Sequence, residues 1–184
     1  MGAYNVPSYS SKRFSFGPGI MYLGVAGTTP TMDIGAVTGD FALEVDRTVL
    51  AIEQGSPQTV VQQYCVKEDV KFSVTGIEWN MTNMSYLLGA GVTTQSGANE
   101  QLDFGGDFNL SNRAVRFVHI QPDGSTIDIQ IFNAQGGGKI KIGGKSKAPH
   151  EFPYDFVALL GTVDFQNAAV PNLKNKFRII RTQA

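Results

Sequence analysis

Side chains that commonly perform nucleophilic or metal chemistry are scarce in this sequence. It contains one cysteine, Cys65, and two histidines, His119 and His150. A structural zinc site needs about four ligands, more than these soft ligands supply at ordinary spacing. Cys65 lies in a predicted strand, where we expect a small packed residue, and His119 also fits a strand as a packed or surface side chain. We therefore predict no metal site and no cysteine nucleophile.

Motifs for phosphate binding and acid–base catalysis are also missing. The nearest approach to a phosphate-binding loop is Gly143-Gly144-Lys145-Ser146. That motif requires an earlier glycine at the position that Lys139 occupies. The acidic residues are spread along predicted strands, and no spacing indicates an acid–base pair. We expect no catalytic residues and no cofactor, and we predict that the chain is not an enzyme.

The composition is typical of a turn-rich β protein. The chain has 184 residues, of which 42% are hydrophobic and 17% are charged, so it contains enough apolar material for one folded domain. The 21 glycines and 12 phenylalanines favour strands joined by tight turns. The net charge of −1 argues against a bulk nucleic-acid binder. Residues 1–12 lack an apolar stretch, and no segment approaches a membrane span, so we expect no signal peptide and no membrane binding.

Charge is distributed unevenly along the chain. Residues 1–135 carry 13 acidic and 7 basic side chains, a net of −6, whereas residues 136–184 carry 3 acidic and 8 basic ones, a net of +5. One interpretation is a scatter of solvated charges. The other is electrostatic complementarity between copies of the chain, because opposite patches fix the register of an interface.

Two long segments predict a β-hairpin of unusual length. Phe41–Glu53 and Gln58–Trp79 alternate apolar and polar residues, and the turn Gly55-Ser56-Pro57 separates them. Strands in ordinary domains have roughly five or six residues. A hairpin of this length must project from its domain or line an extended surface.

The remaining elements predict a mainly β fold. We expect further strands at Ile20–Val25, Met32–Ala36, Ala114–Gln121, Ser125–Asn133, Lys139–Ile142, Glu151–Leu160 and Lys176–Arg181. One helix is expected from Asn80 or Thr82 to Gly89 or Gly91, and Val92–Asn112 is interpreted as a polar connection. The predicted architecture is an antiparallel β-sandwich or partly closed barrel with one flanking α-helix and a long protruding hairpin.

The succession of these motifs resembles one protein family. Phe16-Gly17-Pro18-Gly19-Ile20-Met21-Tyr22-Leu23-Gly24 is followed by Met32-Asp33-Ile34-Gly35-Ala36-Val37-Thr38-Gly39, then by the long hairpin, the helix and the strand Phe152–Leu159. This order resembles that of the tail tube (major tail) proteins of long-tailed bacteriophages, over residues 16–160. The corresponding division is an N-terminal arm (1–15), a tail-tube domain (16–161) and a C-terminal extension (162–184).

The resemblance implies a structural role in a virion. Tail tube proteins form hexameric rings that stack into a tube, and their hairpins pair with neighbouring subunits to close a β-barrel around a channel through which DNA passes. The implied partners are further copies of the chain, the tape measure protein, the tail terminator and the distal tail protein. The implied location is the virion tail, after assembly in the cytoplasm of the host bacterium.

Alternation assigns the side chains to two faces. The face expected to point into the core comprises Phe41, Leu43, Val45, Val70, Phe72, Val74, Ile127, Ile129 and Ile131. The face expected to line the channel comprises Glu44, Asp46, Asp69, Lys71, Ser73, Thr75, Asp128 and Gln130. Contacts between rings are expected at Glu53, Gln54, Gly55, Lys174, Lys176 and Arg178.

Two alternatives remain open at this point. The first is another structural part of a tail, such as a distal tail or terminator protein, which shares the fold and differs mainly in whether it polymerises. The second is a monomeric ligand-binding β-sandwich. A stable monomer in solution would favour the second alternative.

Overall fold

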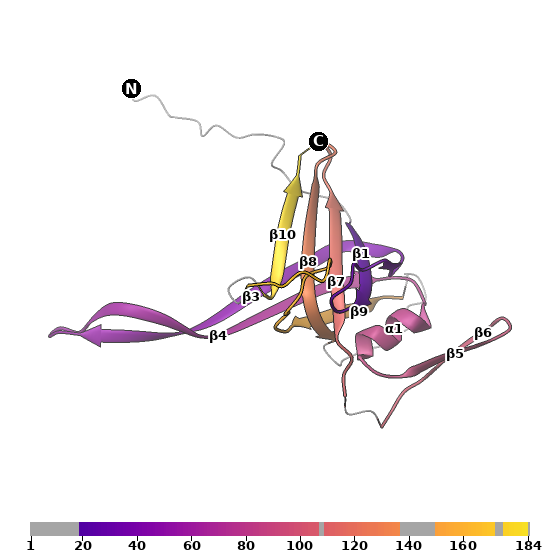
Figure 1. Cartoon of the computed structure of the whole chain (residues 1–184), viewed down its shortest axis with the longest axis horizontal. Coiled ribbons are helices and arrows are strands. Elements are labelled where there is room, and N and C mark those ends of the chain that lie inside the picture. Colours follow the sequence, from indigo (N-terminus) through magenta and orange to yellow (C-terminus); the bar gives the residue numbers. More distant parts are fainter. Residues whose placement is uncertain (1–18, 107–108, 137–149, 172–174, 184) are drawn as a thin grey trace.

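The computed structural model describes residues 19–106, 109–136, 150–171 and 175–183. Its main sheet has eight strands, which are all antiparallel to their neighbours (Figure 1). These strands are β1 (Gly19–Val25), β2 (Met32–Asp33), β3 (Val37–Gln54), β4 (Thr59–Gly76), β7 (Arg113–Ile120), β8 (Thr126–Gly136), β9 (Phe152–Ala158) and β10 (Phe177–Thr182).

The sheet follows the order β2-β1-β7-β8-β9-β4-β3, and β10 pairs with β8 beside this path. Two of its hairpins follow from turn chemistry, since Gly55 and Gly124 adopt positive φ values of 98° and 81°. The predicted fold class is confirmed: the described residues form mainly antiparallel strands with one helix, and their sheet is not closed into a barrel.

The core forms where alternating apolar side chains of neighbouring strands meet. On β9, Phe152, Tyr154 and Phe156 are fully buried, as the alternation predicts. They pack with Phe72 of β4 and Ile131 of β8 in one cluster. Because each strand contributes every second residue to this cluster, the sheet has one apolar face and one mostly polar face.

The predicted helix is confirmed as α1 (Met81–Leu88). Asn80 caps its N-terminus, where the side-chain oxygen accepts a hydrogen bond of 3.0 Å from the backbone N–H of Asn83. Gly89 ends it with a φ of 68°, a conformation that favours glycine. Met84 and Leu87 are buried in the main core, so α1 covers part of the apolar face.

A second, smaller cluster involves the predicted C-terminal extension. Phe165 and Val170 cover Phe132 of β8, and the rings of Phe132 and Phe165 meet edge to face with centroids 5.8 Å apart. The guanidinium of Arg178 on β10 lies over the Phe132 ring, 5.2 Å from its centroid. The extension therefore contributes both a strand and a packed loop to the domain.

Several details differ from the sequence predictions. Val92–Asn112 is not a plain connection, because β5 (Val92–Ser96) and β6 (Asn99–Asp103) form a separate two-stranded ribbon. Cys65 is exposed on β4, not packed, because it lies where the hairpin has left the domain. The predicted strand Lys139–Ile142 lies outside the described residues.

Candidate functional site

The β3–β4 hairpin extends far beyond the domain that carries it (Figure 1). Each strand has 18 residues, and the two remain paired almost throughout. β9 covers the edge of β4 only from Lys71 to Gly76. The part beyond, residues 44–54 of β3 and 59–69 of β4, is called the outer hairpin. Nearly all of its residues are exposed, so the sequence prediction of a projecting hairpin is confirmed.

The outer hairpin carries many apolar side chains that its own domain does not cover. Eight of them are between 43% and 61% exposed: Val45, Val49, Leu50, Ile52, Val60, Val61, Tyr64 and Val66. A two-stranded ribbon is at best marginally stable in water by itself. Large exposed apolar areas on a protein mark interaction surfaces. The outer hairpin is therefore the strongest candidate for a functional surface in the described part of the chain.

One face of the hairpin changes character along its length. Near the domain, Glu44 pairs with Lys71, Asp46 with Asp69 and Thr48 with Lys67, and directly opposed residues share a face. These six residues are called the polar face. Register shifts follow at Thr48/Val49 and Ile52/Glu53. Beyond the first shift, alternation places Leu50 and Ile52 on the continuation of the polar face, with Tyr64 opposite Leu50.

Charges on the polar face are partly neutralised. Asp46 and Asp69 oppose each other, and Lys67 Nζ donates a hydrogen bond of 2.5 Å to Asp69 Oδ2. This hydrogen bond lowers the pKa of Asp69 and raises the pKa of Lys67, and the nearby charge of Asp46 raises the latter further. The positive charge of Lys67 therefore partly offsets the repulsion between these two carboxylates.

The sheet next to the hairpin forms a groove of about 470 Å³ with both polar and apolar walls. Glu44, Lys71 and Ser73, three residues expected to line a channel, are among its walls. β9 adds Asp155 and Val157, which pair with Ser73 and Lys71. Asp155 and Val157 were not predicted as site residues, although their alternation with the buried phenylalanines of β9 indicates that they lie on the opposite face. Thr75 is half-buried further along β4.

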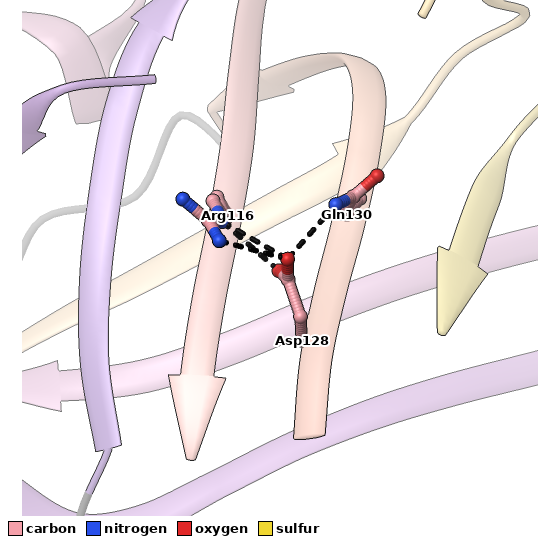
Figure 2. A network of polar contacts seen from close by, with 3 residues as sticks. All are labelled: Arg116, Asp128 and Gln130. Atoms are coloured by element: carbon pink, nitrogen blue, oxygen red, sulfur yellow. Dashed lines mark hydrogen bonds and ion pairs between the residues drawn. The ribbon is translucent and has the colours of Figure 1, made fainter. Parts of the chain in front are cut away.

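Asp128 and Gln130, which were expected to line the channel, are buried in the structure. They are only 8% and 7% exposed, because Arg116 of β7 closes over Asp128 (Figure 2). Arg116 Nη2 donates to Asp128 Oδ2 at 2.9 Å, and Arg116 Nε lies 3.1 Å from each carboxylate oxygen. Gln130 Nε2 donates to the same carboxylate at 2.9 Å. In the single chain these residues form a closed network and not an open wall.

Most residues of the expected core face are buried or half-buried, but two of those on β3 are partly exposed. Val70, Phe72, Val74, Ile129 and Ile131 are buried, and Leu43 and Ile127 pack against them half-buried. Phe41 is 37% exposed, although its ring centroid lies 4.3 Å from that of Phe117. Val45 does not reach the core and is 43% exposed, because no other strand covers the hairpin at its position.

The residues expected to contact other rings lie in two separate places. Glu53, Gln54 and Gly55 are exposed at the tip of the hairpin. Lys176 and Arg178 lie at β10, and Lys174 is outside the described residues. Lys176 Nζ donates to the backbone oxygen of Glu68, and Arg178 Nη1 lies 3.6 Å from Asp164 Oδ2. The chain therefore already uses part of its C-terminal positive charge internally.

Residues with nucleophilic or metal-binding potential do not gather in the described ranges. His119 is buried beside Phe41, and His150 accepts a hydrogen bond of 3.2 Å from the indole N–H of Trp79. Within those ranges, no three His, Cys, Asp or Glu residues form a group that could hold a metal ion. The helix described is too short to cross a bilayer, and no longer apolar helix occurs in the same ranges.

No family model matches the sequence, and no curated protein matches it significantly.

Proposed function

We propose that this chain is the structural subunit of a phage tail tube, which forms stacked hexameric rings around a channel for DNA. The observation that carries the proposal is the outer hairpin, which has eight exposed apolar side chains and, among the strands described, a long unpaired edge on β3. Such an edge promotes uncontrolled pairing with other chains unless a defined partner covers it. Closure of sheets across copies removes the edge, as a barrel does.

The polar face supports a channel role for the hairpin base. It carries Glu44, Asp46 and Asp69 against Lys67 and Lys71, a net charge of −1 from three acidic and two basic side chains. A row of unpaired cations would hold DNA through counterion release. Because Asp69 engages Lys67, this wall offers the polyanion few free cations and permits it to slide.

The proposal is tested by electron microscopy and light scattering of the purified full-length chain. We expect rings or hollow tubes, with the outer hairpin at the contacts between subunits. Single rings that never stack would favour a distal tail or terminator protein. A stable monomer at high concentration would contradict assembly and favour a ligand-binding sandwich.

A matched pair of variants separates assembly from general solubility. Leu50→Asp places a charge on the exposed apolar surface of the outer hairpin, whereas Val25→Asp places one at the end of β1. The two side chains are similarly exposed, at 56% and 58%. We expect Leu50→Asp to abolish assembly and Val25→Asp to leave it intact. Equal effects would show that the hairpin has no special role.

A further inference from the structure

In the described sheet, β10 and the outer part of β3 each have one free edge, and both expose apolar side chains on two faces. β3 pairs only with β4, and β10 pairs only with β8. On β10, the neighbouring residues Ile179 and Ile180 point to opposite faces and are 53% and 38% exposed. On β3, Val49 and Leu50 do the same at 51% and 56%. In the described sheet, β10 and the outer part of β3 therefore lack backbone partners on one side and expose apolar side chains on both faces.

We propose that the free edge of β3 in one copy pairs with the free edge of β10 in the next copy. This pairing rests on the proposed self-assembly and names the two surfaces that meet. Backbone hydrogen bonds between the edges supply affinity, as in other strand additions. The exposed valine, leucine and isoleucine side chains of both strands become covered by each other and by the adjacent sheets.

Charge selects β10 as the partner of β3. β3 carries Asp40, Glu44, Asp46 and Glu53 against Arg47, a net of −3. β10 carries Arg178 and Arg181, a net of +2, and Lys176 directly precedes it. β1 has no charged residue, and β2, which covers part of its outer edge, has only two residues. Opposite potentials favour the β3–β10 pair and disfavour two β3 edges together.

The topology requires that the two strands come from different copies. Within one chain, β4 and β9 separate β3 from β8, the strand that carries β10. Since the two edges are different surfaces, the contact is head-to-tail: each copy offers one edge and accepts the other. Such contacts generate a ring when the rotation closes. Arg178 contacts Asp164, and Lys176, just before β10, contacts the backbone oxygen of Glu68, so both hold β10 in place. The Arg178 side chain is still 41% exposed.

Cross-linking of mixed single-cysteine chains tests the pairing. Cys65→Ser removes the native thiol, Thr48→Cys labels β3 and Thr182→Cys labels β10, all at exposed positions. Thr31→Cys, exposed just before β2, labels the other end of the sheet as a control. Each variant is first shown to assemble as the parent does. The mixtures are treated with a short bismaleimide, which can join the two cysteines in more than one register of the β3–β10 pair. The products are then separated by size under denaturing conditions.

The expected result is a dimer from the mixture of Thr48→Cys and Thr182→Cys chains, with monomers from each variant alone. A chain with both cysteines should give a ladder that ends at the ring size. Three results would overturn the β3–β10 pairing and leave the tail-tube proposal standing. They are a dimer from Thr48→Cys alone, a cross-link from Thr48→Cys to Thr31→Cys and not to Thr182→Cys, and no cross-link within assembled particles. A parent chain that remains monomeric would overturn both.

Discussion

Val45 and Val70 oppose each other across the β3–β4 ladder, yet Val70 is fully buried and Val45 is 43% exposed. This pair marks the place where the hairpin leaves its domain. The pairing of β9 with β4 reaches only as far as Lys71, which is adjacent to Val70, and Val70 is the outermost residue of β4 in the main core. Beyond this pair, alternation continues, but the described part of the domain leaves the apolar side chains exposed.

Substitutions at these two valines should separate folding from assembly. Val70→Asp places an unpaired charge in the core and should lower the free energy of unfolding by about 4 kcal/mol or more. Val45→Asp should change the free energy of unfolding of the monomer by less than about 0.5 kcal/mol, because the side chain is already exposed. Urea unfolding checks both values. Sedimentation should show that Val45→Asp weakens assembly, and equal losses of stability would contradict the assigned boundary.

Two ion pairs of the chain should contribute unequally to the free energy of unfolding. Arg116→Ala leaves the buried carboxylate of Asp128 without its bidentate partner and should cost about 2–3 kcal/mol of unfolding free energy. Arg47→Ala removes an exposed partner of Glu68, 2.7 Å away, and should cost less than about 1 kcal/mol. Adding Asp128→Ala to Arg116→Ala should recover part of the loss, since no buried charge then remains. A smaller cost for Arg116→Ala than for Arg47→Ala would refute this ranking.

Tyr154 should make the fold sensitive to alkaline pH. Burial raises the pKa of Tyr154 to about 12, with a smaller contribution from the charge of Glu78, whereas an unfolded tyrosine ionises near ~10. Because the folded-state pKa is the higher one, this contribution to stability is complete below pH ~10 and is lost as the pH rises towards about 12. Chemical unfolding measured between these pH values should show a decline in unfolding free energy.

Tyr154→Phe is the control variant for this alkaline decline in unfolding free energy, because phenylalanine has no hydroxyl to ionise. Among the described residues, the buried Tyr154 hydroxyl has no hydrogen-bond partner, so its removal should cost little at neutral pH. Near pH 12 the variant should be more stable than the parent by about 2 kcal/mol. Parallel pH profiles for the two proteins would show that Tyr154 ionisation does not control alkaline unfolding.

The main elements could be predicted because each has a local signal. The alternation on either side of Gly55-Ser56-Pro57 indicates the long hairpin, and Asn80 and Gly89 mark the ends of α1. The β5–β6 ribbon was missed because Thr93–Gln95 and Asn99–Gln101 are polar on both faces and show no alternation. Only Leu102 packs against the core, and one apolar residue is too weak a signal.

The limits of the candidate surface depend on tertiary contacts that alternation does not contain. Alternation assigns Val45 and Val70 to one face, but only Val70 is part of the main core, and Val45 is 43% exposed. Similarly, Asp128 and Gln130 alternate with buried isoleucines and were expected to be exposed. Their burial depends on Arg116, which a different strand supplies from 12 residues earlier.

Assembly should respond to salt if the charges of β3 and β10 meet. Screening reduces the attraction between exposed charges over about 8–10 Å at moderate ionic strength. We expect slower assembly as sodium chloride is raised, measured by the growth of light scattering with time. Arg181→Gln should reduce this salt dependence, and an assembly rate that is independent of salt would assign no role to the uneven charge.

Amide hydrogen exchange across the outer hairpin tests the central claim most directly. The full-length protein is measured in dilute and in concentrated solution, with the Leu50→Asp variant, which we expect not to assemble, as the monomer reference. We predict that amides in residues 44–54, which include the free edge of β3, exchange quickly in the monomer and are strongly protected in the concentrated parent protein. Equal and rapid exchange of this segment under both conditions would contradict the claim that other copies of the chain complete the hairpin.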